Sequence, residues 1–279
     1  MLEKAYAKIN LSLDVVEKRA DGYHNLDMIM LPLQLYDTLE VSIADEHEAY
    51  SDDSTVPMDE HNTIIKARNL MIDTYQLKEK FKIILHKQIP SQAGMAGGSA
   101  DAAAVMRAIA KLCNLDVSIE ELSMLGKKVG ADVPFCVYST PAQVQGIGEI
   151  VKPFDFTYNP YVLLVKPPMG VSTKEAFKRI DFVNGVHPHS DDIIQLLNEQ
   201  KYDELPQYAQ NTLEASAFEL VPEIANIKQT LKELGMPMTL MSGSGSTVFS
   251  LSENKELVEK AYEYFKQKAD YFVMITQFK

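Results

Sequence analysis

The chain has 279 residues, of which 46% are hydrophobic, and 27 basic against 39 acidic residues give it a formal net charge of −12. This length suits one large domain or two ordinary ones, and the hydrophobic content excludes disorder over most of the chain. The acidic balance argues against a general binder of nucleic acid or anionic membranes.

Neither a membrane span nor a targeting signal is predicted. No run of about 18 apolar residues is present, and residues 1–6 lack the apolar core of a signal peptide. Cys113 and Cys136 show no metal-binding spacing and fit a reducing compartment. We therefore expect a cytoplasmic protein that binds no nucleic acid and no membrane.

The first half of the chain mixes strands and helices. Apolar residues at the odd positions from Ala7 to Val15 predict a strand with one buried and one polar face. Ser118 and Glu121 form a capping-box pattern, and we expect the helix that they open to end near Gly130 in a left-handed residue. The remaining expectations are a turn at 19–24, strands at 28–35, 38–43 and 81–86, an exposed hairpin or loop at 44–61, and helices at 62–77 and 102–111.

The second half predicts a different unit. Strands are expected at 161–165, 238–241, 247–251 and 271–276, and helices at 222–234 and 254–268. The order β–α–β–β–α–β matches a ferredoxin-like unit, with extra helices inserted between about 173 and 220. We place the domain boundary near 153–160, which gives domains of residues 1–156 and 157–279.

A run of small residues lies between the strand at 81–86 and the helix that follows. Such a run lets backbone N–H groups approach a ligand, and a helix start adds unpaired N–H donors and partial positive charge. This combination favours an anion, most often phosphate. The alternative is a tight turn packed against its neighbours, although such a turn needs only one or two small residues. The segment is Pro90-Ser91-Gln92-Ala93-Gly94-Met95-Ala96-Gly97-Gly98-Ser99.

The loop lacks the spacing of the common nucleotide-binding motifs. No lysine follows Gly98, and the Gly-x-Gly-x-x-Gly pattern is absent from the segment. The sequence therefore predicts a phosphate or nucleotide site of another type.

Four segments, in this order, resemble the GHMP small-molecule kinases: 7–11, the small-residue loop, 130–135 and 242–246. Details at 19–24, 146–149 and 170–173 resemble one branch of that family, which phosphorylates a hydroxyl of a cytidine diphosphate-linked alcohol on a route to isoprenoid precursors. The resemblance covers about residues 5 to 250.

This resemblance implies an α+β fold of two domains, with the active site between them. The first is an N-terminal ATP-binding α/β domain of the ribosomal-protein-S5-like type, and the second is ferredoxin-like. It also implies ATP as the phosphoryl donor, Mg²⁺ as the usual ion, a small-molecule substrate, and a monomer or homodimer.

The resemblance also assigns the catalytic residues. Asp132 would face the substrate hydroxyl as a general base, with Lys8 beside it. The alternative for Asp132 is a carboxylate that holds a turn. The loop 90–99 would cradle the phosphates of ATP, and the Ser99 hydroxyl would lie near the phosphates or the metal ion. The alternative for Ser99 is an N-cap of the following helix.

The cytidine contacts implied by the resemblance are Tyr23 and His24. Phe177 would supply the opposite face of a sandwich around the base, with helix packing as the alternative. Ser172 and Thr173 would bind the diphosphate or the base, or else cap a helix.

The other implied binding residues lie on separate segments. Asn10 points the same way as Lys8 and would bond the substrate or Asp132. Asn62 and Lys87 match positions near the adenine, although Asn62 also suits a helix cap. Gly243 and Gly245 would form a turn over the substrate, or a plain hairpin turn.

The loop departs from the family pattern, because Ala93, Ala96 and Ala100 replace glycine or serine. A Cβ at Ala96 would block close phosphate approach if that position needs a positive φ. Three hypotheses follow: a kinase of the cytidine diphosphate branch, a GHMP kinase for a smaller alcohol, or a non-catalytic nucleotide-binding relative.

Overall fold

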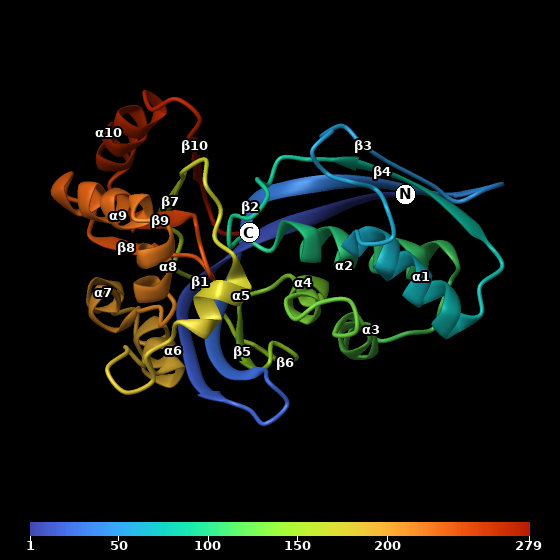
Figure 1. The fold of residues 1–279 in the computed structure, drawn as a ribbon, viewed down its shortest axis with the longest axis horizontal. Helices are drawn as coiled ribbons and strands as arrows, with labels where there is room; N and C mark the ends of the chain where they lie inside the picture. The colour runs from blue at the N-terminus through green and yellow to red at the C-terminus, as the bar shows by residue number, and fades with distance from the viewer.

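The first half of the molecule is a six-stranded sheet with helices on one face (Figure 1). The computed structural model describes residues 1–279. The central strand β2 pairs with β1 along one edge and with β4 and β5 along the other, and only the β3–β4 pair is parallel. The strands are β1 (Leu2–Lys18), β2 (His24–Ala44), β3 (Glu48–Ser51), β4 (Lys80–His86), β5 (Ala142–Gly146) and β6 (Ile150–Pro153), and the helices are α1 (Thr63–Tyr75), α2 (Gly97–Leu112), α3 (Ile119–Gly126) and α4 (Val133–Tyr138).

The second half is a four-stranded antiparallel sheet in the order β10-β7-β9-β8. In chain order this is 4-1-3-2, which confirms the predicted ferredoxin-like unit, as do the helices inserted after its first strand. The strands are β7 (Tyr161–Lys166), β8 (Met238–Met241), β9 (Val248–Ser252) and β10 (Phe272–Thr276). The helices are α5 (Thr173–Lys178), α6 (Ser190–Asn198), α7 (Leu205–Tyr208), α8 (Glu214–Leu220), α9 (Glu223–Glu233) and α10 (Lys255–Lys266), with a 3₁₀ turn at Tyr202–Glu204.

The two sheets share a hydrophobic core. Side chains of β1 and β2, among them Ile9 and Leu31, form one buried cluster with Leu164 of β7 and Phe249 of β9. The chain end also reaches back to the first sheet, where Phe278 bridges to Leu33 of β2 (Figure 1). Burial of this apolar surface fixes the two units against each other.

Three β-bulges in β1 decide which way its side chains point. The register with β2 shifts between Tyr6 and Lys8, between Asn10 and Ser12, and again near the strand end. Ala5 belongs to the core under α2, whereas Ala7 belongs to the core shared with the second sheet. Because a bulge changes the face to which later residues point, Lys8 and Asn10 are turned toward the helix-covered face.

Several sequence-based expectations need correction. The polar positions of β1 are buried, because the helix-covered side of the first sheet encloses Lys8 and Asn10. The two strands expected at 28–35 and 38–43 are one continuous strand, β2. The segment 44–61 contributes β3, which pairs with β4.

Two helix boundaries also differ from the prediction. The helix α2 begins at Gly97, so it includes part of the small-residue loop. The helix α3 ends at Gly126, and Gly130 is not among the residues with a left-handed backbone. The capping box of Ser118 and Glu121 is confirmed, because both of its hydrogen bonds are present. None of the helices is long and apolar enough to cross a membrane.

Candidate active site

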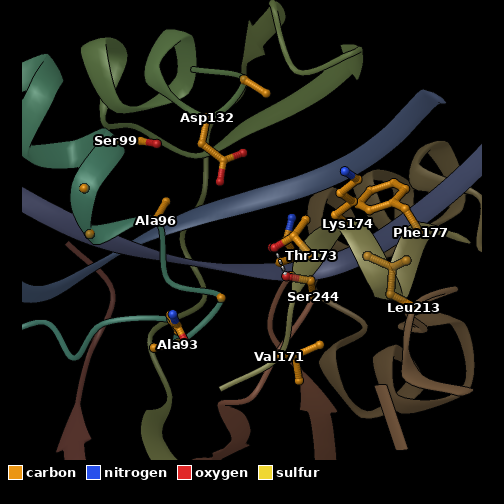
Figure 2. A pocket seen from close by; sticks show the side chains of 18 of the residues that line it. Ala93, Ala96, Ser99, Asp132, Val171, Thr173, Lys174, Phe177, Leu213 and Ser244 are labelled. Carbon is orange, nitrogen blue, oxygen red and sulfur yellow. Dashed lines mark hydrogen bonds between the residues drawn. The ribbon is translucent and has the colours of Figure 1, made fainter. Parts of the chain in front are cut away.

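A cavity of about 1360 Å³ lies between the two units. One wall is formed by the loop 90–99 and the start of α2, and Lys8 and Asp132 line the same space. Figure 2 shows Ser99 and Ala96 on one side of it, Lys174 and Phe177 on the other, and the carboxylate of Asp132 between them. Residues from segments far apart in the sequence thus face a common space.

The loop 90–99 presents free backbone donors to this cavity. Gln92, Gly94 and Ala96 have φ values of 51°, 70° and 57°, so the chain enters the left-handed region at every second residue. None of the N–H groups from Ser91 to Ser99 donates a hydrogen bond within the protein. Free N–H groups at a helix start are suited to bind an anion.

The carbonyl groups of the loop hold it in place. Lys8 N donates to Met95 O over 3.1 Å, and Thr247 N donates to Ala93 O over 3.3 Å. The Gly94 carbonyl accepts hydrogen bonds from Lys8 Nζ at 2.9 Å and from Ser242 Oγ at 3.0 Å. The loop is therefore anchored to both units while its donors stay free.

The alternative role of Ser99 is not realised. Ala96 occupies the N-cap of α2 and Ser99 lies in the first helical turn, where its hydroxyl makes no capping bond. Ala96 does adopt a positive φ, which costs an alanine about 1–2 kcal/mol. Its methyl group is thus part of the wall next to the free N–H groups.

Lys8 and Asp132 come together although they are distant in sequence. Lys8 Nζ lies 3.8 Å from Asp132 Oδ2, and the lysine side chain is 4% exposed against 34% for the aspartate. The ammonium also donates to Asn10 Oδ1 at 2.7 Å. Asp132 is the N-cap residue of α4, but its carboxylate makes no capping bond. The carboxylate is therefore accessible from the cavity and does not hold a turn.

Lys87 lies beneath the start of α2 in a buried ion network. Its ammonium bonds to Asp37 and, at 3.2 Å, to Asp101. Burial would lower the pKa of Lys87, but the two facing carboxylates, Asp101 before Asp37, raise it. Burial raises the pKa of Asp101 well above its ordinary value. Lys87 does line the cavity, with its charge balanced from within the protein.

Asn62 caps α1, the alternative that the sequence left open. Its Oδ1 accepts from Ile64 N at 2.9 Å, and its Nδ2 donates to Pro57 O at 2.7 Å. The residue also lines the cavity.

Aromatic rings gather at the other end of the cavity. The rings of His24 and Phe177 lie 5.0 Å apart, and Tyr23 is 59% exposed beside them. Phe182, which the sequence analysis missed, stacks on His24 at 6.1 Å with an interplanar angle of 12°. In the sequence, Phe182 is a single aromatic residue in a segment without helical or strand periodicity, so no pattern marked it as a site residue. Burial, with a further effect of Lys18, lowers the pKa of His24.

The loop 242–246 closes the cavity from the second unit. Thr173 Oγ1 and Ser244 Oγ lie 2.8 Å apart, as the dashed line in Figure 2 shows, and Ser172 caps α5 through a bond from Glu175 N. Gly243 and Gly245 have positive φ, and a Cβ on Gly243 would lie 3.2 Å from Lys8 Nζ. The loop is packed against the site of the first unit, unlike a plain hairpin turn.

A helix start with free donors, facing a lysine–carboxylate pair across a cleft, is the arrangement expected of a small-molecule kinase. The model of the GHMP kinases N terminal domain matches residues 62–140, and that of the GHMP kinases C terminal domain matches residues 191–270. The chain belongs to the GHMP kinase family.

Two curated relatives that match nearly the whole chain carry the same enzyme name. The 4-diphosphocytidyl-2-C-methyl-D-erythritol kinase of Bacillus subtilis (strain 168) is 40% identical over 264 residues, which cover 94% of this chain and 91% of the relative. The enzyme of that name from Clostridium beijerinckii is 40% identical over 276 residues, which cover 98% and 99%.

Solved structures show the same fold. A crystal structure of 4-(cytidine 5'-diphospho)-2C-methyl-D-erythritol kinase aligns over 100% of both chains with a TM-score of 0.83 and 30% identity. The mevalonate kinase of Methanococcus jannaschii aligns over 100% of this chain and 98% of its own with a TM-score of 0.75, but at 14% identity it supports the fold alone.

Proposed function

We propose that the protein is an ATP-dependent kinase that phosphorylates the 2-hydroxyl of 4-diphosphocytidyl-2-C-methyl-D-erythritol, a step toward isoprenoid precursors. The observation that carries this proposal is one cavity that joins free helix-start donors, the Lys8–Asp132 pair and the rings of His24 and Phe177. The curated relatives named for this activity support it.

The reaction transfers the γ-phosphoryl group of ATP to an alcohol. The acceptor oxygen forms a bond to the γ-phosphorus while the bond from that phosphorus to the β,γ-bridging oxygen breaks. ADP leaves with the electron pair, and the hydroxyl proton passes to Asp132. The free N–H groups from Ser91 to Ser99 hold the phosphates and stabilise the charge on the transferred group.

Lys8 and Asp132 have distinct parts in this scheme. The carboxylate accepts a hydrogen bond from the substrate hydroxyl and fixes its direction toward phosphorus. The ammonium, 3.8 Å away, favours the ionised carboxylate and attracts the developing alkoxide. Its bonds to Asn10 and to the Gly94 carbonyl keep it in place.

The Ser99 hydroxyl lines the same cavity and suits a magnesium ion bound to ATP. It is not used in helix capping, and Mg²⁺ commonly takes substrate phosphates among its oxygen ligands. Ser99 would help to hold the ion, which when bound neutralises charge on the phosphates.

Cytidine recognition favours this acceptor over a smaller alcohol. Tyr23, His24 and Phe177 lie at the end of the cavity away from α2, and a base stacked on such rings gains about 1–3 kcal/mol. Thr173 and Ser172, at the start of α5, lie between the rings and the loop that contains Gly243.

The test is a coupled assay of ADP release with MgATP and the cytidyl substrate. Asp132→Asn should lower kcat by about 10²–10⁴-fold, whereas Asp45→Asn, an exposed control, should leave it unchanged. Release of ADP with homoserine or mevalonate but not with the cytidyl substrate would refute the proposed identity of the acceptor. Full activity in Asp132→Asn would remove that residue from the mechanism.

We further propose domains of residues 1–156 and 157–279. Support comes from residues 154–160, which join the two sheets without a helix or strand. A monomer or homodimer in the cytoplasm stays a prediction of the sequence.

A further inference from the structure

Five lysines line the cavity, and three of them are already neutralised. Lys8 faces Asp132 and Lys87 faces two buried carboxylates, while Lys178 bonds to Glu175 at 2.8 Å. The other two are Lys18 and Lys174, which line the same space and have no carboxylate oxygen within 4.0 Å of the ammonium nitrogen.

Both unpaired lysines lie at the aromatic end of the cavity. Lys18 is the last residue of β1 and pairs across the sheet with His24, close enough for its charge to lower the pKa of that ring. Lys174 follows Thr173 and precedes Phe177 by one helical turn, so it shares a face of α5 with that ring. Figure 2 shows Lys174 beside Phe177, between that ring and Asp132.

An acidic protein needs local cations to hold an anionic acceptor. The chain has a formal net charge of −12. A diphosphate in the cleft would be repelled by this negative charge and by the triphosphate of ATP. The free ammonium of Lys174, between the Phe177 ring and Asp132 (Figure 2), and that of Lys18, beside His24, supply this positive charge along the path of a diphosphate that joins the nucleoside to the alcohol.

We propose that Lys174 and Lys18 bind the diphosphate of the acceptor and select nucleoside diphosphate-linked alcohols over simple ones. This inference rests on the proposed function, since it assigns binding residues for the same substrate. The two lysines act on affinity for the acceptor and take no part in the transfer of the phosphoryl group.

The experiment compares the dissociation constants of cytidine and cytidine 5′-diphosphate by calorimetry. Each of Lys174→Met and Lys18→Met should reduce the preference for the diphosphate about tenfold and leave the affinity for cytidine unchanged. Lys174→Arg should restore the preference to within about threefold, because it keeps the cation. Lys178→Met is the matched control on the same helix, since that lysine is paired with Glu175, and should bind like the wild type.

Kinetics give a second readout on the same variants. KM for the cytidyl substrate should rise about tenfold in Lys174→Met, while KM for ATP and kcat stay within twofold. An unchanged preference for the diphosphate, or an equal loss of cytidine affinity, would overturn the inference. Wild-type protein that binds neither cytidine nor its diphosphate would refute the proposed function itself, before any variant is compared.

Discussion

Gly94 is the point where the two units of the active site meet, and its replacement by alanine is a severe test of the site. A Cβ there would lie well under 3.0 Å from the backbone carbonyl oxygen of Ser242 and 3.0 Å from that of Gly245. The residue also has a φ of 70°. A methyl group must therefore push the loop 90–99 and the loop 242–246 apart.

The cost follows from the contacts that this separation breaks. Left-handed backbone costs a residue other than glycine about 1–2 kcal/mol. The Gly94 carbonyl would lose its bonds from Ser242 Oγ and Lys8 Nζ, worth about 0.5–1.5 and 1.5–3 kcal/mol respectively. We expect Gly94→Ala to lose about 3–6 kcal/mol of unfolding free energy.

The matched control is Gly235→Ala. Gly235 has a φ of 92°, but the nearest atom to its added Cβ is a side-chain carbon at 3.8 Å. Only the backbone strain of about 1–2 kcal/mol applies there. Urea unfolding measures both variants, and ATP titration should show weaker binding in Gly94→Ala alone. Equal loss of stability in the two variants, or unchanged ATP affinity in Gly94→Ala, would show that the loop contact is wrongly described.

Three further results are expected. Phe182→Leu should raise KM for the cytidyl substrate about three- to tenfold by removing the ring stacked on His24. Val183 is 87% exposed in the same loop, and Val183→Ala should leave KM unchanged. Equal effects of the two variants would contradict a role of Phe182 in substrate binding. Burial lowers the pKa of His24 below its usual 6.5, so the ring is mostly neutral above pH 6.5. KM for the cytidyl substrate should therefore stay constant from pH 8 to pH 6.5 and rise only at lower pH. The stability that the neutral ring contributes is likewise lost as pH falls through its folded-state pKa. A KM that changes between pH 8 and pH 6.5 would refute the assignment of His24. Burial raises the pKa of the Cys136 thiol, so a thiol reagent should label only Cys113 in native protein and both residues in urea, and equal native rates would contradict the burial.

The elements with strong local signals were predictable from sequence. The capping box at Ser118, the helix start at Asn62 and the β–α–β–β–α–β order of the second half all depend on short-range patterns, and all are present. The free backbone donors of the loop 90–99 were also predictable, since they follow from small residues ahead of a helix. The resemblance to GHMP kinases added Lys8 and Asp132, which no local pattern connects.

The parts that failed depended on distant partners. The strand β2 continues through the expected break because β1 pairs along its length and β4 and β5 pair with its two ends. These partner strands are distant in sequence, so local patterns in β2 do not predict them. The helix α2 begins at Gly97, ahead of the predicted start, with Ala96 in a backbone conformation that alanine disfavours by itself. Bonds from Lys8 N and Thr247 N to the loop help hold that conformation.

A two-unit α+β chain with free backbone donors ahead of a helix could be predicted from sequence, because periodicity and helix-start residues are short-range properties. The direction in which Lys8 points depends on the folded chain. The alternation of residues 7–15 predicts a polar face but not its partners, whereas bulges on either side of Lys8 and Asn10 turn the Lys8 ammonium toward Asp132. Such a bulge is set by the register between strands and by the packing of two cores, which are interactions between residues far apart in the chain.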